Sequence, residues 1–270
     1  MKQAFAWCLA VLCHGWSVAG VPVQFWTLDN GAKVYLMEVH SLPMVDIQIE
    51  WDAGSRRDPK DMSGLAQATA MMLSKGVKPR DNEPALDENQ LGEAWADLGA
   101  LPHASVSQDR FSLSLRTLTQ PDLLEAAIAL AARQLAEPSF PEAVWQIERE
   151  RWLASWRESN TKPNVQASRA FTRAVYGSHP YGQEVDEISL KAMDTEAMKA
   201  FHATHLRPCR AKVSIVGALT REQASAKAQQ LLQGLPAGVS CELLPWVHED
   251  RKSTRLNSSH VSESRMPSSA

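Results

Sequence analysis

The chain has 270 residues, 44% of them apolar, which is enough for one large domain or two small ones with a real core. Its formal net charge of −3 argues against a nucleic-acid binder, which would need a strongly basic surface. Composition therefore favours a globular protein and excludes the strongly basic classes.

Residues 1–19 have the pattern of a secretory signal peptide. Lys2 provides a positive start, Ala4–Leu12 an apolar core, and Ser17-Val18-Ala19 a small-residue cleavage site before Gly20. The apolar run is shorter than the about 20 residues that a membrane span needs. We expect a cleaved signal peptide and a periplasmic or secreted protein, with a membrane anchor as the alternative.

The hydrophobic pattern of the body predicts strands and helices in segregated groups. Asn30-Gly31 is a strong hairpin signal, and Ser63 is an expected helix N-cap. These groups indicate an α+β fold in which helices cover a mostly antiparallel sheet. The expected strands are 24–28, 32–39, 44–52, 101–107, 110–118 and 211–216, and the expected helices are 64–76, 86–98, 122–135, 142–159, 165–176, 195–205 and 220–232.

Several short motifs occur in an order that points to one family. They are Leu28-Asp29-Asn30-Gly31, Leu42-Pro43, Asp52-Ala53-Gly54-Ser55-Arg56, Gly64 to Gly76, Leu98-Gly99-Ala100, Pro138-Ser139-Phe140, Glu148-Arg149-Glu150-Arg151, Tyr176 to Gly182, and Val213-Ser214-Ile215-Val216-Gly217. Together they resemble the insulinase/pitrilysin-type metallopeptidases, the inverzincins, which include mitochondrial-processing-peptidase-like proteins. The resemblance implies a metallopeptidase half-domain of the LuxS/processing-peptidase type over residues 20–243, a linker starting at 244–250, and a C-terminal half that is missing here.

The helix at 64–76 is where such enzymes carry H-x-x-E-H, two zinc-binding His residues on one helix face with a Glu that activates water. In this sequence those positions hold Gln67, Ala70 and Met71. Gln is a poor zinc ligand, Met prefers softer metals, and Ala has no proton to transfer. The scaffold is expected to be present without its chemistry, so we assign no catalytic residue.

The family's third ligand is a Glu that follows a run like 148–151, and the nearest positions here are Arg157 and Glu158. Arg157 is expected at the ligand position. A catalytic zinc site needs three protein ligands. We therefore expect no metal site and no cofactor in this chain, with zinc only in a catalytic partner.

The strand at 101–107 is the expected substrate-binding element. In the family, the equivalent strand is an exposed edge that pairs with the substrate peptide through main-chain hydrogen bonds, a mode that does not need the catalytic residues. Pro102 fits an edge position. The alternative is an ordinary edge strand protected by polar residues. The expected peptide-binding residues are His103, Ala104, Ser105, Val106 and Ser107.

Two further features leave alternatives open. Residues 251–270 are rich in Ser without an apolar period, so we expect disorder, and they resemble translated sequencing-adapter sequence, an artefact. Cys209 and Cys241 would remain after signal cleavage, and they could form a disulfide or stay as two buried thiols.

Two other clusters are weaker candidates for a site. His202 and His205 have a spacing that metal sites use, but a surface or capping role is the simpler interpretation. Trp145, Trp152 and Trp156 lie close to one helix face, which favours core packing over a ligand platform.

The resemblance and the lost motif lead to a functional hypothesis. We expect a non-catalytic subunit that helps to bind and enclose peptide substrates for a zinc-dependent sister peptidase, in a heterodimer and without nucleic acid or a stable membrane span. The alternatives are a stand-alone periplasmic peptide-binding or assembly protein and, less favoured, an active metallopeptidase with an unusual site.

Overall fold

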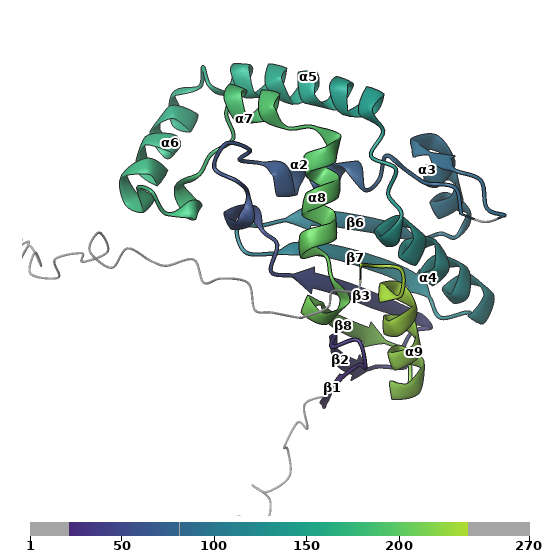
Figure 1. Cartoon of the computed structure of the whole chain (residues 1–270). Helices are drawn as coiled ribbons and strands as arrows, with labels where there is room; N and C mark the ends of the chain where they lie inside the picture. Colours follow the sequence, from purple (N-terminus) through teal and green to yellow (C-terminus); the bar gives the residue numbers. More distant parts are fainter. Residues whose placement is uncertain (1–21, 81, 237–270) are drawn as a thin grey trace, which may run out of the picture.

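The computed structural model describes residues 22–80 and 82–236. In them, helices cover a sheet of six strands (Figure 1). The strand order is β1-β2-β8-β3-β7-β6, and β2–β8 is the only parallel pair of that sheet. The α+β prediction with a mostly antiparallel sheet is confirmed. The strands are β1 Val23–Thr27, β2 Lys33–Glu38, β3 Met44–Trp51, β6 Leu101–Val106, β7 Phe111–Leu118 and β8 Lys212–Gly217.

Each expected helix is present, together with one helix that the sequence did not indicate, Glu187–Ala192, and several short elements. The helices are α2 Leu65–Met72, α3 Glu88–Asp97, α4 Pro121–Ala136, α5 Glu142–Ser159, α6 Pro163–Tyr176, α7 Glu187–Ala192, α8 Thr195–His205 and α9 Arg221–Leu232. The short elements are the turns η1 Ser55–Arg57, η2 Pro180–Gly182 and η3 Pro208–Arg210, and a two-stranded ribbon of β4 Gly76–Val77 and β5 Leu86–Asp87.

The sheet has one apolar face under the helices and one open face. Along β3, Val45, Ile47, Ile49 and Trp51 are buried, whereas the alternate side chains Asp46, Gln48 and Glu50 are not. This alternation is expected of a sheet that is covered on one side. The open face carries ion pairs between neighbouring strands, such as that of Arg116 with Asp46.

The last of the described strands, β8, lies in the middle of the sheet, between β2 and β3. Gly217, at the end of β8, permits this insertion because a Cβ there would lie 2.3 Å from the carbonyl oxygen of Met44. Its φ of +147° is also rarely adopted by residues with a side chain. Close packing of the strands therefore requires the glycine that ends the 213–217 motif.

Two expectations for the helix at 64–76 were wrong. The helix is shorter, ending at Met72, because the chain turns away so that Gly76 can pair with Asp87 in the β4–β5 ribbon. Ser63 does not cap it: the N-cap residue is Gly64, which adopts a φ of +101° and has no side chain that could accept a capping hydrogen bond.

Other expectations lie outside the described residues or are settled only in part. The signal peptide at 1–19, the linker at 244–250 and the tail at 251–270 all lie outside them. Among the described residues, no helix has the length and apolar character needed to cross a bilayer. Cys209 is disulfide-bonded, which excludes a free thiol at that position, and its partner lies outside the described residues.

Candidate functional site: the exposed face of α2 and the outer edge of β6

The start of α2 is held by a buried carboxylate. The Asp58 side chain accepts hydrogen bonds from the backbone N–H groups of Gly64, at 2.8 Å, and Ala66, at 2.9 Å. These are N–H groups that a helix cannot satisfy internally. Burial raises the pKa of Asp58 to about 6, although the bonds from the backbone oppose that rise.

This burial makes stability depend on pH. Folded protein binds the Asp58 proton more tightly than the unfolded chain, so the free energy of unfolding should fall as pH rises from about 4 to 6, by about 3 kcal/mol in all. We expect Asp58→Asn to remove this slope. Urea unfolding from pH 4 to 7 measures the contribution of Asp58 as the difference in the free energy of unfolding between the variant and the wild type at each pH.

The exposed Asp61 provides the control, because Asp61→Asn should leave the slope unchanged. Variants must be compared with the wild type, because His205 contributes a pH dependence of the opposite sign. Burial and the nearby Arg210 lower the pKa of His205 to about 4, so the stability that the neutral His205 contributes is lost as pH falls. Parallel curves for wild type and Asp58→Asn would contradict the role of Asp58.

One stripe of α2 faces solvent, and it contains two of the three degenerate positions. Gln67 is exposed and Met71 is half-buried, one helical turn apart on the same face, whereas Ala70 is buried with 6% of its surface accessible. The rest of α2 packs in the core. Positions 67 and 71 are therefore oriented as ligands on an accessible face would be, but they carry an amide and a thioether.

These side chains do not fit a zinc ion. Among the described residues, no three or more His, Cys, Asp or Glu side chains are grouped so that they could hold a metal. An amide at position 67 and a thioether at position 71 are poor partners for zinc, and Ala70 cannot act as a base. We therefore derive no metal-dependent step for this chain.

The contacts of α5 place a different residue beside α2 than the sequence suggested. Arg157, expected at the third-ligand position, instead donates to Glu187 of α7 at 2.7 Å and is exposed. Glu148 accepts from Lys75, three residues after α2, at 3.1 Å. On the next turn, Trp152 approaches Gly64. Residues 148 and 152 therefore lie on the face of α5 that is turned toward α2, and Arg157 lies on a different face.

Lys75 joins three elements at the end of this stripe. It is largely buried and binds Glu148 of α5 and Glu88 of α3, the latter at 2.6 Å. Burial alone would lower the pKa of Lys75, but the two carboxylates outweigh burial and raise it. Lys75 is therefore engaged by both carboxylates, and Glu148 also accepts from Arg151 at 3.1 Å. Sequence reasoning assigned no role to Lys75 or Asp58, because their partners are distant along the chain or are backbone groups.

The strand β6 is the edge of the sheet, as expected, and no described strand pairs with its outer side. The backbone N–H of Ser107 donates to the carbonyl of Arg110 at 2.8 Å, which marks a hydrogen-bonded pair with β7. Such pairs alternate along an antiparallel ladder, so His103 and Ser105 also bond inward. The backbone groups of Ala104 and Val106 therefore point outward.

The expected peptide-binding residues thus separate into distinct groups. Ala104 and Val106 have outward backbone groups, and their half-buried side chains pack against the core. His103 and Ser105 have exposed side chains on the open face of the sheet. Ser107 lies beyond β6 and closes the hairpin to β7. Pro102 sits at an outward position, where its missing N–H removes no bond to β7.

A loop that follows β3 fixes the β6–β7 hairpin. Ser55 and Arg56 donate their backbone N–H groups to the carbonyls of Ser107 and Gln108, each at 3.0 Å. A Cβ on Gly54 would lie 2.4 Å from three backbone atoms of residues 108–110. The Asp52–Arg56 motif is therefore explained by close backbone packing that sets the position of the edge strand.

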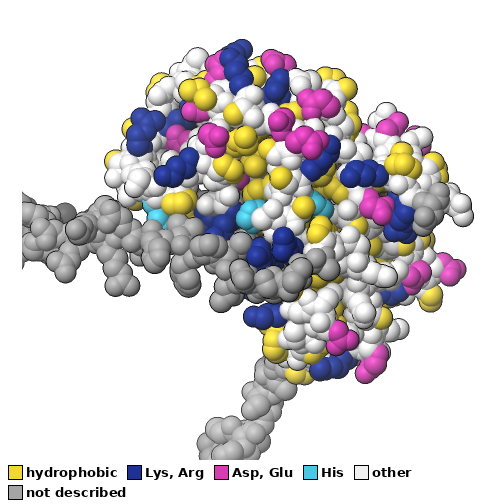
Figure 2. All heavy atoms as spheres, in the orientation of Figure 1, with side chains coloured by type: hydrophobic (Ala, Val, Ile, Leu, Met, Phe, Trp, Pro, Cys, Tyr) yellow, Lys and Arg dark blue, Asp and Glu magenta, His cyan; other side chains and the backbone are white. Residues whose placement is uncertain are grey.

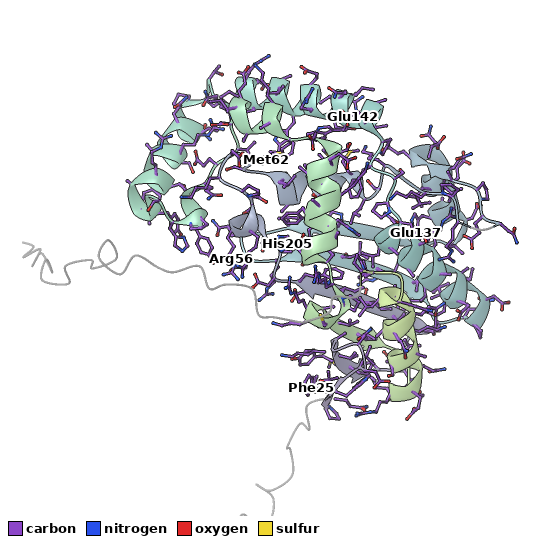
Figure 3. All side chains as sticks on the ribbon, in the orientation of Figure 1. Phe25, Arg56, Met62, Glu137, Glu142 and His205 are labelled. Carbon is purple, nitrogen blue, oxygen red and sulfur yellow. The ribbon has the colours of Figure 1, made fainter. Side chains whose placement is uncertain are left out.

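A charged network surrounds this contact. Arg56, labelled in Figure 3, binds Asp52 at 2.7 Å and Asp109 of the hairpin at 3.2 Å. The Tyr181 hydroxyl donates to Asp109 at 2.5 Å, and this bond raises the pKa of Tyr181. The turn at 179–182 is thereby joined to the hairpin tip. The positive and negative charges of this network neutralise one another, so we assign its residues the role of positioning the β6–β7 hairpin.

The two weaker candidates are structural. His202 is buried, not at the surface, and its Nε2 lies 2.7 Å from the carbonyl oxygen of Leu135 at the end of α4, which is a capping contact. Trp145 is fully buried and donates to the carbonyl of Met193, and Trp156 donates to the carbonyl of Val185. Core packing is thus the role of the Trp stripe.

Comparisons with known proteins agree with this fold. A family model described as the peptidase M16 inactive domain matches residues 192–267. A peptidase M16 inactive domain from Pseudomonas fluorescens is 30% identical, with a TM-score of 0.77 over 84% of this chain and 53% of that one. Both matches support a degenerate member of the M16 family, the insulinase/pitrilysin family that its motifs suggested.

Two further structures share the fold at lower sequence identity. A protease from Helicobacter pylori is 18% identical, with a TM-score of 0.71 over 85% of this chain and 54% of its own. The periplasmic protease PqqL from Escherichia coli is also 18% identical, with a TM-score of 0.68 over 83% and 25%. The chain therefore spans about half the length of the first two relatives. A search of curated proteins found no match.

Proposed function

We propose that this M16 domain is a non-catalytic peptide-binding subunit, which helps to bind and enclose peptides for a zinc-dependent sister peptidase. The observation that carries the proposal is the open edge of β6, with the outward backbone groups of Ala104 and Val106, in a domain whose α2 stripe has no zinc ligands. A peptide added to that edge would gain main-chain hydrogen bonds without any catalytic group.

The inactive-domain match and the periplasmic PqqL support the rest of the proposal. A domain that matches an M16 inactive domain is expected to act without its own zinc, next to an active partner. The predicted signal peptide and the relation to PqqL favour the periplasm as its location. Co-expression with an H-x-x-E-H paralogue, followed by size-exclusion chromatography, tests the heterodimer; two separate peaks would contradict it.

Ala104→Pro tests the peptide edge directly. It removes one outward N–H and no hydrogen bond to β7, so the fold should persist while peptide affinity falls about five- to tenfold. The measurement is fluorescence anisotropy with a labelled extended peptide long enough to pair with the whole of β6.

Ala104→Ser is the matched control, because it changes the side chain and keeps the N–H group. It should bind the peptide like the wild type. Circular dichroism of both variants verifies that the sheet is intact. Equal affinity of wild type and Ala104→Pro, or no binding of extended peptides by the wild type, would exclude this edge as the peptide site.

A further inference from the structure

Helix α6 is amphipathic but has its apolar side turned outward. Most of its apolar residues recur at the spacing of one helix face, and all of those on that face are exposed. We call this set the α6 stripe: Ala167, Ala170, Phe171, Ala174 and Val175. Phe171 has 68% of its surface accessible and Val175 45%, so the stripe is not covered by any described residue.

The opposite side of α6 is the side that contacts the body. Its half-buried residues are Val165, Arg169 and Thr172, and at 100° per residue their centre lies about 160° around the helix from that of the α6 stripe. The Arg169 guanidinium lies 5.2 Å from the Trp156 ring centre and donates to Asn160. A helix held by a cation with its apolar side outward is the reverse of ordinary core packing.

This arrangement indicates a surface that is built to be covered. Isolated exposed apolar residues are common, but a contiguous stripe over two helical turns marks an interaction site. In Figure 1, α6 lies at the periphery, away from the sheet. On the face drawn in Figure 2, basic and acidic side chains are interspersed over the rest of the surface, without a field of one sign.

The charge next to the α6 stripe indicates its partner. The helix has two charged residues, Arg169 and Arg173, and no acidic one. Arg169 is engaged with the body, near Glu184 as well, whereas Arg173 has no ion-pair partner among the described residues. Arg173 and Ala170 border a cavity of about 450 Å³ beside the stripe. A second copy of α6 would bring only like charges to this surface.

We propose that the α6 stripe docks an acidic amphipathic helix of a partner protein, with apolar residues on the stripe and a carboxylate opposite Arg173. This is a helix-in-groove type of contact and is separate from strand addition at β6. It does not depend on the proposed peptide-binding function, because the two surfaces lie on different elements.

Two designed helical peptides test the proposal with the full chain. Both have leucines at the spacing of the α6 stripe, and they differ only in having Glu or Lys beside the leucines. In anisotropy titrations we expect the Glu peptide to bind at least about tenfold more tightly than the Lys peptide. Phe171→Glu should lower the affinity for the Glu peptide by about tenfold or more. Added salt should reduce the difference in affinity between the Glu and Lys peptides.

Ile188→Glu is the control, since Ile188 is a similarly exposed apolar residue on α7, with 76% accessible, outside the α6 stripe. Ile188→Glu should leave the affinity for the Glu peptide unchanged. The labelled extended peptide that tests the β6 edge should bind all variants with the same affinity. Equal binding of the two peptides, no binding of either, or an unchanged affinity in Phe171→Glu would overturn the proposal. Self-association of the chain that Phe171→Glu abolishes would also overturn it, in favour of a second copy as the partner.

Discussion

Gly54→Ala should lower the free energy of unfolding by about 3 kcal/mol and weaken peptide binding at β6. Gly54 has an ordinary extended conformation, with φ of −74° and ψ of 178°, so alanine causes no backbone strain there. The effect comes from packing, because the new Cβ would lie 2.4 Å from the backbone of the β6–β7 hairpin. Since backbone cannot yield as a flexible side chain does, the hairpin must move.

The movement should break the two bonds from Ser55 and Arg56 to the hairpin, each 3.0 Å long, and thereby loosen the end of β6. Gly92→Ala is the matched control, because Gly92 lies inside α3 with open space around its Cβ position. That change should stabilise the protein by about 1 kcal/mol. Urea unfolding measures both; a Gly54→Ala protein as stable as the wild type would contradict this account of the motif.

Loss of the Cys209 disulfide should destabilise the protein by about 3 to 4 kcal/mol. Of the other cysteines, Cys8 and Cys13 belong to the predicted signal peptide, so we expect Cys241 as the partner. That bond would close a loop of about 32 residues, and the chain-entropy estimate for such a loop is about 4 kcal/mol.

Cys209→Ser and reduction by dithiothreitol should have the same effect, and Cys209→Ser/Cys241→Ser should be no less stable than the single variant. Thermal and urea unfolding of the oxidised protein measure the loss. Mass spectrometry of the non-reduced digest should recover a peptide that joins 209 to 241. Recovery of Cys241 as a free thiol would contradict the pairing.

The local elements could be predicted because their signals are local. Asn30-Gly31 requires a tight turn, and the alternation of Val45, Ile47 and Ile49 specifies a strand with one buried side. The limits of α2 could not be predicted, because Asp58 and the pairing of Gly76 with Asp87 decide them across the fold. For the same reason Arg157 was placed near α2 by sequence, whereas its side chain binds Glu187.

The sequence by itself determined the α+β class, the M16 resemblance and the loss of the ligand residues at Gln67, Ala70 and Met71, because each depends on residue type and spacing along the chain. Only the tertiary structure decided which groups meet. It shows β8 between β2 and β3, Glu148 beside Lys75, and the α6 stripe facing outward. The amphipathic period of α6 reveals that one side is apolar, but which side contacts the body depends on Trp156 and Asn160, which lie in another helix and at its end.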